Sequence, residues 1–393
     1  MNKRKLGKIS AILLALVCTV STAVACGKEP VVEQPPTLDP ETPAVVLDLP
    51  GNDSVEDKPS DEPEVYEETK EGFIRSELTN EWIDESLENQ RPIAVMIDNE
   101  LTALDHYGVN SADVVYEMMN STANGRVTRL MVLIKDWEKI EQLGSIRSTR
   151  PTNVMTAGEW NAILVNDGGP FYIDGYIAQP YCNNLSGGFA RFSNGKAQEF
   201  TEYVTYEGYT NPSTGKSYSG LGKRIEASGY STEYNKYYEG AHWNFAKGES
   251  SMSKDSKAEK DIKDISLPFP HNKSELKYNN DTKLYEYYEY GKAHIDPLDD
   301  NNVTSFTNVI LQCMSFTQLD DNGYLCYNVT DSTSHEGYYI TKGVAVPITW
   351  EKNTPEGITH YYYKSTGEEI DLNTGKTYIA FVPADSWDEV EMK

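Results

Sequence analysis

Familiar catalytic signatures are missing from the 393 residues of this chain. The sequence has no Gly-x-Ser-x-Gly nucleophile elbow, no His-Glu-x-x-His zinc helix, no phosphate-binding loop of the Gly-x-x-x-x-Gly-Lys-Ser type and no Cys-x-x-Cys pair. Only six histidines are present, so few side chains could serve as general bases near neutral pH. These absences make an enzyme less expected without excluding one.

Positive charge is also scarce. The 35 Lys and Arg residues stand against 61 Asp and Glu residues, which gives a net charge of −26. Such an acidic body is repelled by nucleic acid, by anionic lipid headgroups and by teichoic acid. We therefore expect no nucleic-acid partner.

Long apolar runs are absent as well. After the N-terminal segment, no stretch approaches the about 18 apolar residues of a membrane-spanning helix, and the apolar part of that segment is too short to span a membrane. Residues 1–25 have the layout of a signal peptide, with basic residues followed by a short apolar segment from Ile9 to Val17. Ala23–Cys26 resembles a bacterial lipobox, in which Cys26 would be acylated and become the mature N-terminus. This predicts a lipid anchor at the extracytoplasmic face of the cell membrane, and the alternative is an ordinary secretory signal with Cys26 incidental.

Composition divides the rest of the chain into four parts. Residues 26–71 are rich in proline and acidic residues and poor in large apolar ones, which is typical of a disordered tether. Residues 72–246 are expected to form a mixed α/β domain with a central sheet, and residues 247–265 a linker. Residues 266–393 are expected to form a mostly β domain. The predicted fold class is therefore α+β.

Periodicity and turn signals predict the main elements. Apolar runs in the first domain predict buried strands at Ile93–Ile97, Ala112–Glu117, Val127–Ile134 and Ala162–Asn166. Pro151 suits the first turn of a helix from Thr152 to Trp160. Helical spacing also favours a helix within residues 71–90, marked by Leu78, Trp82, Ile83 and Leu87. Tyrosine-rich alternation in the second domain predicts strands, among them Lys283–Tyr290, Val303–Leu319, Gly323–Val329 and Thr359–Lys364.

The strongest local signal is electrostatic and lies in residues 126–150, where basic residues outnumber acidic ones. Arg129, on its predicted strand, shares a face with apolar residues, and a guanidinium in such a place must be paired. Asp98 and Glu117, at the ends of neighbouring strands, are the natural partners. One interpretation of the region is therefore a structural ion pair.

The other interpretation of this region is an anion pocket. Arg147, Ser148 and Arg150 lie next to the predicted helix that starts at Pro151. Two guanidinium groups and a helix N-terminus together favour a carboxylate or a phosphate. The complete set of predicted ligand-binding residues is Asp98, Asn99, Glu117, Arg129, Arg147, Ser148, Arg150, Asp167, His242 and Asn244.

Two histidines are further candidates. His242 could act as a general base, although a lone histidine is more often a hydrogen-bonded structural residue. His294 and Asp296, with the acidic residues that follow, could hold a hard cation such as calcium. The same Asp-rich loop also makes a good turn, so we predict no metal and no cofactor.

Several motifs together resemble one known family. In the first domain they are Arg91–Asn99, Ala112–Glu117, Arg126–Arg129 and Gly144–Arg150, and in the second Lys292–Asp296, Asn308–Ile310, Gly343–Trp350, Gly367–Leu372 and Gly375–Tyr378. Taken in this order, they are similar to the YerB-like lipoproteins of Gram-positive bacteria, over roughly residues 74–385. The resemblance implies an anchored extracytoplasmic lipoprotein with a two-part α+β architecture. It implies no activity, because the function of that family is unknown.

The chain departs from the family pattern at three places. Ala123-Asn124-Gly125 stands where the family typically has Glu-Gly-Gly, and Asp167–Pro170 replaces a His-Gly-Gly-Ser-like segment. Gly240–Asn244 retains only part of an Arg-x-Ala-Pro-His-Asn pattern. If those positions form a catalytic set in the family, these departures favour binding over catalysis here.

Two functions are compatible with these residues. The first is a non-catalytic envelope lipoprotein that binds a cell-wall glycan, a small anion or an envelope protein through the region around Arg129 and Arg147. The alternative is a cell-wall polymer hydrolase or transferase in which Asp98 or Glu117 is the acid/base, with His242 as a further catalytic candidate.

The cysteines give a testable prediction. Cys313 and Cys326 flank the turn signal Asp320–Gly323. If Asn322-Gly323 is a two-residue turn, Cys326 faces Leu319, which is roughly 20 Å along the strand from Cys313 and beyond the about 7 Å reach of a disulfide. We therefore expect no disulfide between them. Peptide mapping by mass spectrometry under non-reducing conditions would contradict this hairpin if it found the bond.

Overall fold

The computed structural model describes residues 69–248, 250, 252, 255, 257–330 and 335–393. The predicted signal peptide, Cys26 and the predicted tether up to residue 68 lie outside these ranges. In the part of the chain that is described, no helix is both long and apolar enough to cross a membrane.

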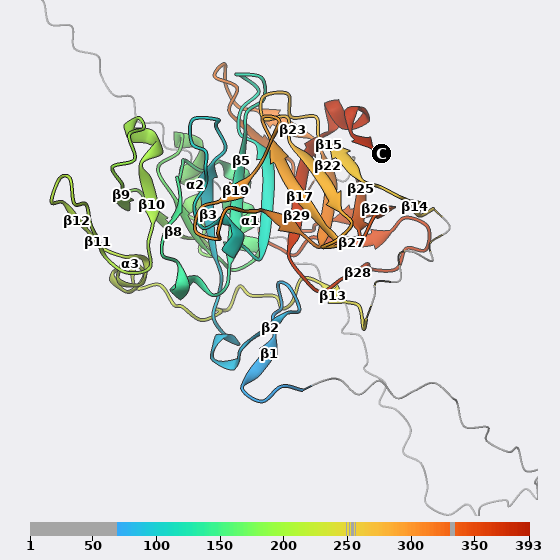
Figure 1. The fold of residues 1–393 in the computed structure, drawn as a ribbon, viewed down its shortest axis with the longest axis horizontal. Coiled ribbons are helices and arrows are strands. Elements are labelled where there is room, and N and C mark those ends of the chain that lie inside the picture. The colour runs from blue at the N-terminus through green and yellow to red at the C-terminus, as the bar shows by residue number, and fades with distance from the viewer. Residues whose placement is uncertain (1–68, 249, 251, 253–254, 256, 331–334) are drawn as a thin grey trace, which may run out of the picture. The chain divides into compact units, whose positions relative to one another are not determined.

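One eleven-stranded sheet contains strands from both halves of the sequence (Figure 1). Ten strands follow the order β14 (Glu259–Lys260), β26 (Val344–Glu351), β25 (Glu336–Thr341), β22 (Asn308–Met314), β29 (Thr377–Pro383), β4 (Val114–Met119), β5 (Thr128–Ile134), β3 (Ile93–Asp98), β7 (Ile163–Asn166) and β8 (Asn183–Ser186). The eleventh strand, β27 (His360–Tyr363), pairs with β26. Strand β29 runs parallel to both of its neighbours, β22 and β4, so it joins the two halves.

The middle strands of this sheet form where the apolar runs predicted them. Every residue of β3, β4 and β5 is buried, as expected for strands covered on both faces. Helix α1 (Pro151–Glu159) begins at its proline, and the side chain of Asn153 accepts a hydrogen bond from the backbone N–H of Arg150 at 2.9 Å. The predicted strands and helix of this region are therefore confirmed.

Side-chain alternation gives the sheet two different faces. On one face Met96 and Met131 pack with Val154 and Trp160 of the α1 segment. On the other, the neighbouring positions along β3 and β5 pack against a six-stranded sheet. That sheet contains β15 (Asp264–Ser266), β16 (Glu275–Asn279), β17 (Leu284–Glu289), β18 (Lys292–Ala293), β21 (Ser305–Phe306) and β30 (Glu391–Met392). The fold is α+β with a mostly β C-terminal part, as predicted.

Short elements connect these layers. The strands are β1 (Phe73–Arg75), β2 (Trp82–Asp84), β6 (Leu143–Gly144), β9 (Ala190–Arg191), β10 (Glu202–Val204), β11 (Tyr209–Thr210), β12 (Ser217–Tyr218), β13 (Asn244–Phe245), β19 (Ile295–Asp296), β20 (Asn302–Val303), β23 (Phe316–Gln318), β24 (Leu325–Tyr327) and β28 (Asp371–Leu372). The helices are α2 (Asp174–Ile177) and α3 (Leu221–Ser228), with 3-10 turns at Glu85–Leu87, Val109–Ser111, Trp137–Lys139, Phe171–Ile173, Gln198–Phe200 and Ala384–Glu389.

The helix predicted within residues 71–90 is wrong. This segment forms the β1–β2 hairpin, in which Ile74 faces Ile83. Asn80 adopts a left-handed backbone conformation (φ 57°) and donates its N–H to Ser76, which closes a turn where a helix would have continued. In the segment predicted as a linker, β14 pairs with β26 and joins the central sheet.

The two-residue turn predicted at Asn322-Gly323 is also wrong. In the β23–β24 hairpin Cys326 faces Thr317 instead of Leu319. The Asp320 carboxylate accepts the backbone N–H groups of Asn322 (3.0 Å) and Tyr324 (3.1 Å), which stabilises a longer loop. Cys313 and Cys326 are both free, so the absence of a disulfide between them is confirmed.

The shared sheet makes the predicted domain boundaries testable. Residues 72–246 expressed alone would lack β29, and the apolar strand β4 would become an exposed edge. We expect this fragment to aggregate or to show no cooperative thermal unfolding by circular dichroism. Co-expression with residues 247–393 should restore a soluble complex. A monomeric fragment with a sharp unfolding transition would show instead that the first half folds independently.

Candidate functional site

A cavity of about 520 Å³ opens at the ends of β3 and β5, and we call it the arginine pocket. Its walls combine the end of β3, the connection from β4 to β5, the segment before α1 and the loop between β23 and β24. The lining residues are Asp98, Glu100, Asn120, Ser121, Ala123, Asn124, Val127, Arg129, Arg147, Arg150, Asp321, Asn322 and Tyr324. Four predicted site residues, Asp98, Arg129, Arg147 and Arg150, thus line one cavity.

The central sheet places the first two of these side chains. Asp98 ends β3 and lies opposite Arg129 of β5 in the antiparallel register. The segment after β6 then runs beside β3, with the N–H of Arg147 bonded to Met96 O at 3.0 Å and the N–H of Asp98 bonded to Ser145 O at 3.0 Å. This pairing positions Arg147 at the end of β3.

Asp98 forms an ion pair with Arg147, whose Nε lies 2.9 Å from Asp98 Oδ2. Only 3% of the Asp98 side chain is exposed. Burial raises the pKa of the Asp98 carboxyl, and the charges of Arg129 and Arg147 oppose that rise. No donor is aligned on Oδ2 as a hydrogen bond, so the contact is mainly electrostatic. Arg147 Nη2 also lies 2.6 Å from Glu199 Oε2, so two carboxylates neutralise this arginine.

Arg129 and Arg150 are different, because neither forms an ion pair with any carboxylate in the described part of the chain. Both are buried, and both donate to Ser148 Oγ, at 2.9 Å from Arg129 and 3.3 Å from Arg150. Arg129 Nη1 also donates to Ser148 O, and Arg150 Nη1 to Thr149 O. The Arg150 guanidinium lies 4.4 Å from the ring centre of Tyr324.

The surroundings of these two arginines disfavour their charge. Burial and the nearby Arg150 lower the pKa of Arg129 to about 9, and burial lowers the pKa of Arg150 to about 10. Three carboxylates line the pocket: Asp98 contacts Arg147, Glu100 contacts His271 at 3.0 Å, and Asp321 lies on the exposed β23–β24 loop. Two buried cations therefore face the pocket with no carboxylate within ion-pair distance among the described residues, although the charge of Asp98 still favours the charged form of Arg129.

Glu117 and Asn99 do not belong to this pocket. Successive side chains on a strand alternate between faces, and this places Glu117 on the face opposite Asp98. Burial raises the pKa of the Glu117 carboxyl, while four hydroxyl groups donate to it, from Thr128 (2.6 Å), Ser274 (2.6 Å), Tyr287 (3.0 Å) and Tyr378 (2.5 Å). Asn99 Nδ2 donates to Thr128 Oγ1 at 3.0 Å within the same network.

Asp167 lies beside the pocket wall and contacts different partners. Its N–H bonds to Arg147 O at 2.9 Å, but its carboxylate lies 3.4 Å from Arg191 Nη2. Arg191 also pairs with the buried Glu202. Burial and the Asp167 carboxyl raise the pKa of Glu202 to about 7. Asp167 therefore belongs to a two-carboxylate, one-arginine cluster.

His242 and Asn244 lie away from the pocket. The ring of His242 stacks on Trp160 at 3.7 Å, and its Nε2 is 3.9 Å from Glu159 Oε1. Burial lowers the pKa of His242 to about 4, while Lys352 pairs with Glu159 at 2.5 Å. Asn244 Nδ2 donates to Glu369 Oε2 at 2.9 Å.

Asp296 and His294 belong to different environments. The Asp296 carboxylate accepts three backbone N–H groups, from Gly108 (3.0 Å), Asn110 (2.9 Å) and Leu298 (2.9 Å), which is a structural role. His294 lies instead in a buried cluster with His106 and Glu289, whose candidate ligand atoms are all within 4.8 Å of one another. These are the described residues that could hold a metal ion.

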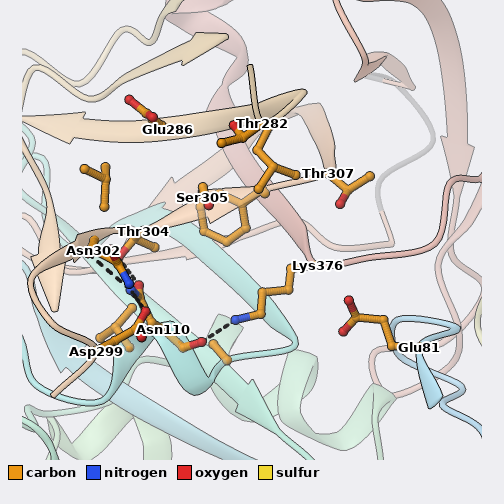
Figure 2. Close-up of a pocket in the computed structure, with 15 residues that line it drawn as sticks. Glu81, Asn110, Thr282, Glu286, Asp299, Asn302, Thr304, Ser305, Thr307 and Lys376 are labelled. Atoms are coloured by element: carbon orange, nitrogen blue, oxygen red, sulfur yellow. Dashed lines mark hydrogen bonds between the residues drawn. The ribbon is translucent and has the colours of Figure 1, made fainter. Parts of the chain in front are cut away.

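A second cavity, of about 490 Å³, lies near this cluster (Figure 2). Figure 2 shows Lys376 reaching Asn110, and Asn110 next to Asp299, Asn302 and Thr304. No local sequence pattern indicated this cavity, because its walls come from segments far apart in the chain. No local pattern indicated His106 and Glu289 of the buried cluster, or Tyr324 of the arginine pocket, either. Only the folded chain brings these residues to their sites.

Comparisons with known proteins agree on one family. Residues 78–231 match the family model described as "Protein of unknown function (DUF3048) N-terminal domain", and residues 265–379 match its C-terminal domain. A curated relative, "Putative lipoprotein YerB" of Bacillus subtilis (strain 168), is 27% identical over 95 residues, which are 24% of this chain and 28% of that protein. The crystal structure of YerB protein from Bacillus subtilis superposes with a TM-score of 0.64 at 18% identity, over 81% of this chain and 99% of that one, and this likeness concerns the fold.

The Glu202 cluster predicts a pH dependence of stability. The pKa of Glu202 is raised to about 7 from an ordinary value of 4.5. Between pH 4.5 and pH 7, Glu202 is therefore protonated in the folded state and ionised in the unfolded state. Stability should therefore fall as pH rises through this window, by up to about 3 kcal/mol. Glu202→Gln should remove this loss. Urea unfolding of both proteins at pH 5 and pH 8 measures it, and an equal pH dependence in the two would contradict the assignment.

Proposed function

The chain belongs to the DUF3048 family, whose function is unknown, and from this premise we propose that it is a lipid-anchored extracytoplasmic protein that binds an anionic ligand in the arginine pocket. The observation that carries the proposal is the pair of buried arginines, Arg129 and Arg150, that line the pocket with no carboxylate within ion-pair distance among the described residues.

The energetic argument rests on the cost of burying charge. A buried guanidinium loses its hydration, and hydrogen bonds to neutral oxygens repay only part of that cost. Here the two groups also repel each other, and both share the single hydroxyl of Ser148 in addition to their bonds to backbone oxygens. An anion in the pocket would relieve both penalties and accept charge-assisted hydrogen bonds from both arginines. A carboxylate, a phosphate or a sulfate fits this chemistry.

The location of the protein is supported by independent features. Cys26 ends a lipobox-like segment, and the curated relative is named a lipoprotein. An exposed site on an anchored protein would meet cell-wall glycans, small anions or other envelope proteins. The chain carries a net charge of −26, so its surface as a whole repels a polyanion. A small anionic group that fits into the cationic pocket avoids most of this repulsion.

The alternative, a hydrolase or transferase that uses Asp98 and Glu117, gains no support from this geometry. A carboxylate pair for acid/base work must flank one scissile bond. Asp98 and Glu117 point to opposite faces of the sheet, Asp98 is ion-paired with Arg147, and Glu117 is enclosed by four hydroxyl donors.

The proposal predicts that inorganic phosphate raises the thermal unfolding midpoint at constant ionic strength, relative to chloride. Arg129→Gln should abolish this rise, because it removes one of the two unpaired cations. Loss of a charge-assisted hydrogen bond of about 1.5–3 kcal/mol corresponds to roughly 10- to 100-fold weaker binding. Titration calorimetry with phosphate, and then with muropeptides, measures the affinity.

A matched control is available in Arg126→Gln. Arg126 lies three residues before Arg129 in the same β4–β5 segment, and it pairs with Asp385 outside the pocket. This variant should keep the full phosphate response. The proposal fails if Arg129→Gln binds phosphate as the unmodified protein does, or if both variants lose the response equally.

A further inference from the structure

Two buried histidines meet ring to ring between the two sheets. His106 Nδ1 lies 2.7 Å from His294 Nε2. Both residues are buried, with 0% of His106 and 3% of His294 exposed. The outer nitrogen of His106, Nε2, lies 2.6 Å from the backbone oxygen of Asp98. A carbonyl oxygen can only accept, so His106 Nε2 carries the hydrogen. In a neutral ring, Nδ1 is then a bare lone pair that faces His294.

A chain of contacts fixes the tautomer of His294 in the same way. Asn110 Nδ2 donates to Asp299 Oδ2 (2.8 Å) and to Asn302 O (3.2 Å), so Asn110 Oδ1 is turned toward Thr304. The Thr304 hydroxyl donates to Asn110 Oδ1 at 2.6 Å (Figure 2). Thr304 Oγ1 must therefore accept from His294 Nδ1, 2.8 Å away. This leaves Nε2 of His294 as a lone pair as well.

Two lone pairs thus face each other at 2.7 Å, which is repulsive unless a cation lies between them. Glu289 adds to the imbalance. Its carboxyl is 1% exposed, neither oxygen has a hydrogen-bond partner, and Oε1 lies 3.8 Å from His294 Nε2. The amides of Asn99 and Asn272 lie nearby, but their Nδ2 groups donate to other acceptors.

We propose that His106, His294 and Glu289 bind one divalent transition-metal ion, with zinc as the best match. The two imidazole nitrogens and one carboxylate oxygen of Glu289 offer three ligand atoms, a His2Glu set of the kind that holds zinc with a fourth position open. Zinc–nitrogen bonds of about 2.0–2.1 Å would separate the two nitrogens by roughly 3.3 Å, a small widening from the observed distance.

The surroundings have the features of a metal site beyond its ligands. The outer nitrogen of each histidine is already held by an oxygen, Asp98 O or Thr304 Oγ1, which orients the rings toward the shared centre. Burial raises the pKa of the Glu289 carboxyl, and the nearby Glu117 raises it further, so a cation bound there would stabilise the charged form of Glu289. Thr304 lines the second cavity and so lies between that cavity and His294 (Figure 2).

The experiment uses the purified full-length chain, freed of metal by dialysis against a chelator. Cobalt(II) added as a probe should bind at one equivalent and give visible absorption bands of a His/carboxylate site, and zinc should displace it. Zinc at 100-fold excess over its dissociation constant should raise the unfolding midpoint on the order of 5 °C, whereas magnesium should not.

Glu289→Gln and His294→Gln should each lose at least 10-fold in zinc affinity and change the cobalt spectrum. His242→Gln is the matched control, since His242 is a buried histidine near a single carboxylate and should leave binding unchanged. If the variants do not fold, the cobalt spectrum and the metal content of the unmodified chain still test whether the site binds a metal ion. A chain that binds neither metal at one equivalent overturns the proposal and indicates a shared proton between the histidines.

Discussion

The parallel pairing of β29 with β22 and β4 is the constraint on which the rest of this structure depends. Strand β29 comes from the last part of the chain, yet it supplies the middle of the central sheet. The two family segments, 78–231 and 265–379, therefore share one hydrogen-bonded framework. The six-stranded sheet covers one face of this framework and α1 covers the other. Without the β29 pairing, both faces of the central sheet would be incomplete.

The alternation of side chains on this framework separates two polar clusters. Asp98 and Arg129 project to the α1 face and form the arginine pocket with Arg147. Glu117 projects to the other face, near His294 and Glu289. Asp98 connects the two clusters, because its carboxylate pairs with Arg147 and its backbone oxygen accepts from His106. A metal ion at the histidines would thus also hold the end of β3, where the pocket begins.

Much of the first half could be predicted because the signal is local. Continuous apolar runs required buried strands, and a proline after a basic segment marked the start of α1. The hairpin in residues 71–90 was missed because Leu78, Trp82, Ile83 and Leu87 recur at helical spacing, while one left-handed residue, Asn80, decides the turn. The β23–β24 turn was misplaced because the side chain of Asp320 stabilises a longer loop than the Asn-Gly signal suggests.

The sequence by itself determined the acidic charge, the strands β3, β4, β5 and β7 of the central sheet and the cluster of arginines between residues 126 and 150. It also determined that Arg129 needed a partner on an apolar face. Only the tertiary structure decided that Asp98 joins the arginines while Glu117 does not. The register of the strands determines the face of the sheet to which each side chain projects. It likewise decided that His106, His294 and Glu289 meet, because contacts between residues so far apart in the chain follow from strand order and register, which no local pattern encodes.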